Sequence, residues 1–439
     1  MQCFVGNAVS AFRHLRAAKY YFDIAKSGLI EQNSTAVEPL GSCIVRLELV
    51  AQLFLPIPGI SFLGETIGNT FNDIKLDGND EMVQILDLHR IIAHYQDVTR
   101  SILTPLSGNI TRLDSVQVNE FQTELRQWRN VSSDLFEDCD EEPIMPSLPS
   151  SSWASLDELP IPPRPQYFSS VETAITVALY NCFMAHTMWL LSITTNTSHP
   201  CETLAYLYVY QIIRIAEGLL YSNPDRKRDG ERYFSSEALN IGLAPILYLS
   251  AQCCYSPAWQ QWIVDKLRHI GREGMFNSEA FATCLSMLKS FQDTEKTNVL
   301  SENDDVWQSR SPLGPPACRV IPTLLPDPDG SQFTGYYMRL PTGCHNPSTF
   351  PKPSLEVVGR AQWRVDGSDS TEQKWSADIH TDHLAVKDLS DMRTEIEVQS
   401  KRWEMLFRNT PCQMSRSIDD YINECDFPEL PKTSTHTHA

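Results

Sequence analysis

A few polar side chains in this sequence have a type and spacing that could support chemistry. His380, Asp382 and His383 lie close together and could offer two imidazoles and a carboxylate to a metal ion. No further ligand follows at a suitable spacing, and the surrounding stretch is polar. We therefore interpret these three residues as exposed polar side chains. His14 lies on an apolar helical segment, which favours a hydrogen-bonded core histidine over a ligand.

The adjacent cysteines Cys253 and Cys254 fall at the end of a predicted buried helix, with no basic neighbour to produce a reactive thiolate. Trp259 and Trp262 have helical spacing, which indicates core packing rather than a binding platform. The motifs GxSxG, GxxxxGK[ST], GxGxxG and HExxH do not occur in the sequence. We assign no catalytic, cofactor-binding or metal-binding residue and do not expect an enzyme. An enzyme with an unrecognised site stays open as an alternative.

The overall charge argues against a chain that binds nucleic acid by itself. The 439 residues include 55 Asp and Glu against 36 Lys and Arg, a formal net charge of −19. Phosphate backbones attract Lys and Arg, so such a chain needs a separate basic module to bind DNA. The densest basic run, Arg226 to Arg228, is short enough to be a solvated turn. The 12 cysteines form no CxxC pair, which indicates reduced thiols in a cytosolic or nuclear protein.

Apolar residues recur at helical spacing through the first two thirds of the chain. The apolar stretch 174–193 is interrupted by polar residues, so we interpret it as a buried core helix and expect no membrane partner. Phe121, Leu125 and Trp128 form an aromatic stripe whose spacing favours core packing over a ligand box. Ser256 before Pro257 is a helix start signal, and Asn277 or Ser278 is another. We predict helices at 11–22, 37–55, 79–99, 113–136, 169–193, 201–221, 235–251, 257–271 and 278–292.

These patterns predict a mainly α fold in four parts. Residues 1–136 and 168–300 form the two halves of a multi-helix domain. Residues 137–167 form an acidic, Pro- and Ser-rich loop, which is either a flexible connection or an activation segment. Residues 301–439 form a less regular, partly disordered extension. There we predict strands at 335–340 and 357–365, pairing as a small sheet or ribbon, and a helix at 388–407.

Several segments resemble the regulatory domain of fungal Zn₂Cys₆ binuclear-cluster transcription factors. The most specific is 262–285, WIVDKLRHIGREGMFNSEAFATCL, where that family often has a tryptophan helix, an Ile-Gly-Arg-Glu-Gly turn and a Glu-Ala-Phe helix. The segments 6–15, GNAVSAFRHL, and 46–54, RLELVAQLF, are similar to earlier helices of the same domain. The resemblance extends over about 1–292. It implies an α-helical regulatory domain, often encoded beside genes for specialised metabolism.

The resemblance does not include the cysteine cluster that gives this family its name. No position matches the six zinc-binding cysteines, so no zinc ion is expected, and their lack argues against direct DNA binding by this polypeptide. Either the DNA-binding module has been lost or the start of the gene is misassigned. We expect a nuclear transcription regulator that acts through other transcription factors or the transcription machinery and can form a homo- or heterodimer. The alternative is a cytoplasmic helical scaffold or small-ligand-binding protein without catalytic activity.

Overall fold

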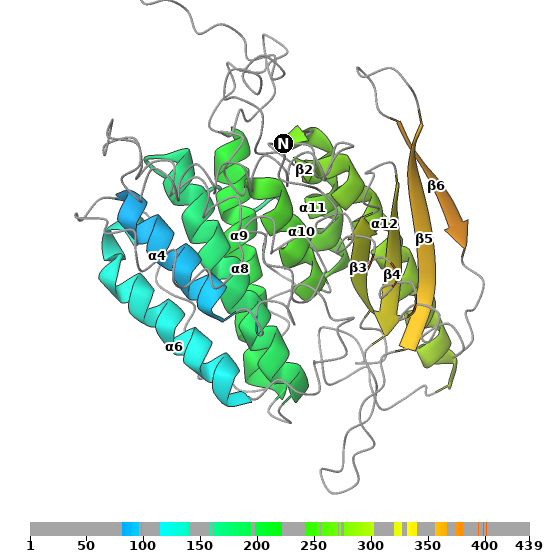
Figure 1. Ribbon diagram of the computed structural model, residues 1–439, viewed down its shortest axis with the longest axis horizontal. Helices are drawn as coiled ribbons and strands as arrows, with labels where there is room; N and C mark the ends of the chain where they lie inside the picture. The colour runs from blue at the N-terminus through cyan, green and yellow to red at the C-terminus, as the bar shows by residue number, and fades with distance from the viewer. Residues whose placement is uncertain are drawn as a thin grey trace, which may run out of the picture.

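The structure is a computed structural model. It describes residues 81–95, 98, 115–137, 139, 159, 161–194, 198–221, 242–254, 256–270, 272–273, 276–302, 320–326, 332–339, 356–366, 374–380, 394, 398 and 401. These residues form a mainly α fold, which confirms the predicted fold class. The helices gather into one body, and a small sheet lies at its side (Figure 1). The predicted helices 11–22 and 37–55 lie outside the described residues.

The helical body contains seven α-helices and one short 3₁₀ helix among the described residues. In chain order they are α4 (Glu81–His94), α6 (Ser115–Val131), η3 (Ser133–Phe136), α8 (Val171–Thr194), α9 (Ser198–Tyr221), α10 (Leu243–Cys253), α11 (Pro257–Ile270) and α12 (Ser278–Glu302). The predicted start signals at Pro257 and Ser278 are both confirmed. The predicted helix at 235–251 was wrong at Gly242, and its residues 235–241 lie outside the described residues. Gly242 takes a positive φ of 75°, which interrupts a helix, so α10 begins at Leu243.

α8 is the central helix of the fold. The segment Val171–Ser192 is long and apolar enough to cross a membrane by length and composition, yet 94% of its most apolar window is buried inside the protein. Helices α6, α9 and α10 all pack against it (Figure 1). A helix that is apolar around its whole circumference needs neighbours on every side to remove that surface from water. The observed burial agrees with the predicted core helix.

Aromatic residues fix the contact between α6 and α8. The Trp128 and Tyr180 rings lie 5.8 Å apart between centroids, and Phe121 meets Phe183 edge-to-face at 6.0 Å. Such pairs each contribute about 0.5–1.5 kcal/mol beyond the burial of their area. The Trp128 indole Nε1 donates a hydrogen bond of 2.8 Å to the Gln84 carbonyl, which connects α6 with α4. The aromatic stripe on α6 is therefore core, as predicted.

The predicted C-terminal strands belong to a regular four-stranded antiparallel sheet. Its strands are β3 (Val320–Pro326), β4 (Gln332–Arg339), β5 (Glu356–Asp366) and β6 (Lys374–His380), in the order β3-β4-β5-β6. β4 and β5 include nearly all of the predicted strands 335–340 and 357–365, whereas the sequence analysis did not find β3 and β6. Helix α12 packs on β3 and β4. α12 also continues to Glu302, ten residues beyond the predicted end at 292.

Candidate functional site

Several of the chemistry-bearing side chains that the structure describes lie on α8, α10 and α12 or against them. At the junction with the sheet, Cys284 of α12 lies between two tyrosines. The Tyr337 hydroxyl donates a 3.0 Å hydrogen bond to the Cys284 carbonyl and lies 3.5 Å from its Sγ, and the Tyr248 hydroxyl lies 3.7 Å from the same sulfur. Burial raises the pKa of Cys284 to about 11 and raises the pKa of both phenols. All three groups are therefore neutral at pH 7.

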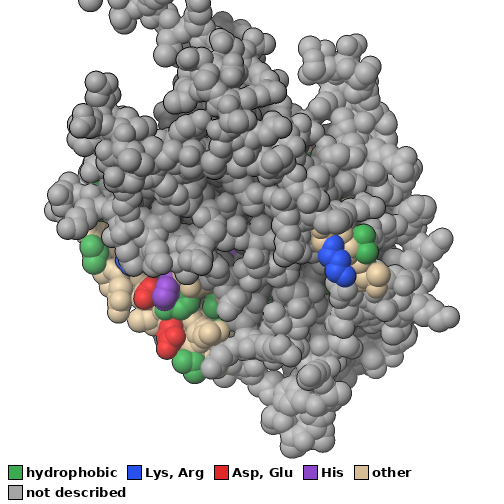
Figure 2. Space-filling view, in the orientation of Figure 1, with side chains coloured by type: hydrophobic (Ala, Val, Ile, Leu, Met, Phe, Trp, Pro, Cys, Tyr) green, Lys and Arg blue, Asp and Glu red, His purple; other side chains and the backbone are tan. Residues whose placement is uncertain are grey.

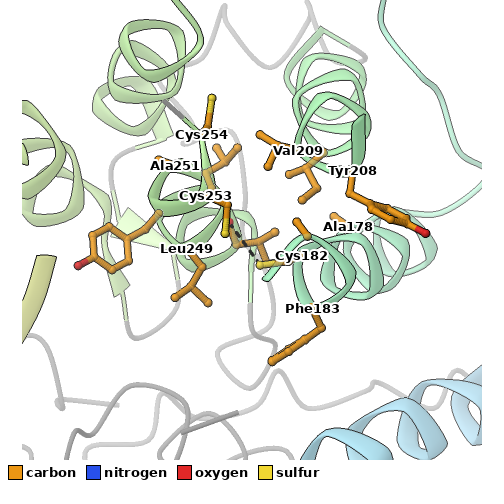
Figure 3. Close-up of a cluster of buried hydrophobic side chains, with 14 of the residues drawn as sticks. Ala178, Cys182, Phe183, Tyr208, Val209, Leu249, Ala251, Cys253 and Cys254 are labelled. Atoms are coloured by element: carbon orange, nitrogen blue, oxygen red, sulfur yellow. Dashed lines mark hydrogen bonds between the residues drawn. The ribbon is translucent and has the colours of Figure 1, made fainter. Parts of the chain in front are cut away.

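A second group of thiols lies between α8 and α10. Figure 3 shows Cys182 beside Cys253 among apolar side chains, with Cys254 just past the end of α10. Burial raises the pKa of Cys182 and of Cys254 to about 12, and it raises that of Cys253 as well. A nucleophilic cysteine needs a lowered pKa, usually from a cation or a helix N-terminus. These thiols are shifted in the opposite direction and act as small apolar side chains, which agrees with the interpretation of Cys253 and Cys254.

His186 lies one turn beyond Cys182 and is fully buried. Its Nε2 is 3.0 Å from the Leu249 carbonyl, which can only accept, so Nε2 carries the proton. Burial lowers the pKa of this imidazole to about 4, and its edge meets the Trp189 ring at 6.1 Å. Its Nδ1 is buried without a hydrogen-bond partner among the described residues. Sequence reasoning could not single out His186, because one histidine in an apolar run carries no spacing signal.

A charge pair with a buried carboxylate connects α9 with α11. The Lys266 ammonium lies 2.7 Å from the Glu217 carboxylate, whose side chain is only 4% exposed. The same ammonium sits 5.1 Å from the centre of the Trp262 ring, within the range of a cation–π interaction. The two partners are far apart in sequence, and neither helix shows a pattern that would have predicted the contact.

The side chains singled out in the sequence divide into two groups. Trp259 and Trp262 are both buried and lie in the core, as predicted. His380 is the last residue of β6, whereas Asp382 and His383 lie outside the described residues, as do His14, Arg226 to Arg228 and most of 137–167. The structure therefore does not test the interpretation of His380, Asp382 and His383 as exposed polar side chains. Within the described part of the chain, no group of three or more His, Cys, Asp or Glu could hold a metal ion.

The surface that can be seen offers a mixed set of side chains. On the face drawn in Figure 2, the described residues toward one end of the molecule place acidic, apolar and histidine side chains next to one another. Arg129 on α6 lies 4.6 Å above the Phe136 ring and so covers part of the apolar core. Neighbouring charges of both signs are typical of a solvated protein surface.

The described residues of the segment with the most specific sequence pattern form two packed helices joined by a short strand pair. Residues 262–285 comprise most of α11, the short antiparallel pair β1 (Arg272–Glu273) and β2 (Phe276–Asn277), and the first turns of α12. The pair aligns Arg272 with Asn277 and Glu273 with Phe276, which turns the chain back so that α12 packs along α11. Its helical apolar residues enter the core, among them Ile263, Leu267, Ile270, Phe281, Cys284 and Leu285.

Comparison with known proteins gives no relative for this chain: no family model, no curated protein and no solved structure matches it.

Proposed function

We propose that this chain is the helical regulatory part of a transcription regulator of the fungal zinc-cluster type, acting in the nucleus through contacts with other proteins. The observation that carries the proposal is the segment 262–285. Its tryptophan helix, tight turn and second helix match the order that the resemblance implies. The β1-β2 pair joins two helices whose apolar faces belong to one core, which supports a folded regulatory unit in this segment.

The charge and the core chemistry support a role in binding rather than in DNA contact or catalysis. A net charge of −19 opposes approach to DNA, which favours contact with the targets through a partner. The buried thiols, phenols and imidazole described above all have pKa values shifted toward their neutral forms. Neutral, fully packed groups stabilise a core but supply no activated nucleophile or base.

A tethered reporter assay tests this function. The full chain is fused to a heterologous DNA-binding domain and expressed with a reporter that carries sites for that domain. We expect reporter output to move clearly above or below the level given by the DNA-binding domain alone. The unfused chain should show no shift of a DNA probe. A nuclear, folded fusion whose output equals that of the DNA-binding domain alone would contradict the proposal.

Two aspartate substitutions show whether the folded helical domain causes the change in reporter output. Leu267→Asp places a charge at a position of α11 that is fully buried, and it should remove the reporter effect by disrupting the core. Val131→Asp makes the same kind of change at a position that is 81% exposed, and it should leave the effect intact. Full output from Leu267→Asp would assign the activity to an unfolded acidic segment instead.

A further inference from the structure

A proline-rich segment precedes α8 and lies against α9. Residues 162–168 have the sequence PPRPQYF, and residues 163–168 form neither helix nor strand. Proline fixes φ at about −65° and drives the residue before it toward extended backbone, so the prolines at 162, 163 and 165 favour the polyproline II conformation. This conformation has about three residues per turn. Its side chains therefore form three rows along the segment, each containing every third residue.

One of these rows is buried and fixes the segment in place. Pro163 and Gln166, three residues apart, are both buried. The main-chain N–H of Gln166 donates a hydrogen bond of 3.0 Å to the main-chain carbonyl of Arg214 on α9, and the Arg214 Nε donates one of 3.2 Å to the carbonyl of Arg164. A partner that binds this segment therefore meets a backbone that is already held by α9, which lowers the entropy cost of binding.

The other two rows are accessible to solvent. Arg164 and Tyr167 form one of them, and both are exposed, Tyr167 by 56%. Pro162, which is exposed, and Pro165, which is half-buried, form the other. These two prolines have the PxxP spacing that SH3, WW and EVH1 domains bind in grooves lined by aromatic side chains. A groove that approaches from one side contacts two rows of a polyproline II helix, and here the row left over is the buried one.

We propose that residues 162–167 dock an SH3-type domain, with an aromatic groove for Pro162 and Pro165 and a carboxylate beside it for Arg164. Charge selects a partner of this kind. The chain carries a formal charge of −19, yet Arg164 and Arg214 bring two guanidinium groups to this one segment. A guanidinium forms its strongest hydrogen bonds with carboxylates, so a groove flanked by acidic residues is favoured over a neutral one. The inference names a partner for the protein contacts of the proposed function and rests on it in that respect.

Isothermal titration of the full chain with a panel of purified SH3 domains, each with acidic residues beside its groove, tests the contact. At least one domain should bind, and a synthetic PxxP peptide that occupies the same groove should compete. Arg164→Glu should weaken binding about ten- to a hundredfold, because it removes a charge-assisted hydrogen bond. Arg126→Glu makes the same change at an exposed position of α6 and should leave the dissociation constant unchanged. No binding by any domain, or an equal loss in both variants, would overturn the proposal.

A proline substitution separates recognition in a groove from attraction of charge alone. Pro165→Ala keeps every charge and removes one ring of the PxxP pair, so it should weaken binding about three- to tenfold. Pro257→Ala changes an exposed proline at the start of α11 and should have no effect. Unchanged affinity in Pro165→Ala, with circular dichroism showing a folded chain, would contradict recognition of the polyproline II segment.

The binding assay and the reporter assay fail independently of one another. A chain that changes reporter output but binds no SH3 domain would overturn the docking inference and leave the proposed function standing. A chain that binds through Arg164 and Pro165 without any reporter effect would support the docking surface and contradict the proposed function.

Discussion

Gly218→Ala is a substitution for which local and tertiary effects have opposite signs. Gly218 lies within α9, where alanine favours the helix by about 1 kcal/mol over glycine. The residues 163–168, which we call the strap, cross α9 at this point. A Cβ built on Gly218 would lie 1.7 Å from the Gln166 carbonyl oxygen and 2.6 Å from its carbonyl carbon. Both are backbone atoms, so the strap itself has to move.

The cost of moving the strap follows from its contacts. The main-chain N–H of Gln166 donates a hydrogen bond of 3.0 Å to the main-chain carbonyl of Arg214. The Arg214 side-chain Nε donates a second bond, of 3.2 Å, to the main-chain carbonyl of Arg164. Each hydrogen bond contributes about 0.5–1.5 kcal/mol, and exposing the buried Pro163 and Gln166 adds about 1 kcal/mol. The total of about 2–4 kcal/mol exceeds the helix gain. Gly218→Ala should therefore destabilise the protein by about 1–3 kcal/mol.

Urea unfolding followed by far-UV circular dichroism measures this change. Limited digestion with chymotrypsin gives a second readout, because Tyr167 in the strap is 56% exposed and its bond should be cut faster once the strap is released. Arg214→Ala is the control: it removes one strap hydrogen bond without a clash and should cost less than Gly218→Ala. If Gly218→Ala raises stability by about 1 kcal/mol, as helix propensity alone requires, the reasoning from close backbone approach is refuted.

Three further predictions concern the buried polar groups. Tyr337→Phe should lower the free energy of unfolding by about 1 kcal/mol in urea, because it removes the hydrogen bond to the Cys284 carbonyl; no loss would mean that this bond does not help hold the sheet to α12. The pKa of His186 falls from the ordinary 6.5 to about 4 on folding, so the unfolded chain alone takes up a proton between these values. Stability should therefore decline by up to about 3 kcal/mol as the pH falls from about 6.5 to about 4, and His186→Gln should reduce that slope; an equal slope in the variant would show that other groups cause it. Lys266→Met should destabilise by about 1–3 kcal/mol by leaving the Glu217 carboxylate buried without its cation, and adding Glu217→Gln should recover most of the loss in the same unfolding assay; a double variant no better than the single one would mean that packing, not charge, caused the effect.

The sequence predicted an element well where the signal for it lies within the element itself. Helix boundaries at Pro257 and Ser278 follow from capping chemistry, and strand alternation placed β4 and β5 closely. The sequence was less informative where an element depends on its neighbours. The end of α12 was placed too early, since its later turns do not show the strong apolar periodicity that marks the first ones. β6 was missed because its short alternation becomes evident only beside β5.

The sequence by itself determined the helical class, the apolar faces and the core role of Trp128, Trp259 and Trp262, because helical periodicity is a local property of the chain. The tertiary structure alone decided which polar groups meet. The Lys266 and Glu217 pair, the Tyr337 hydroxyl on Cys284 and the strap over Gly218 all join segments that are distant in sequence. Long-range contacts arise from how the helices and the sheet pack, and the spacing of residues within one segment does not predict them.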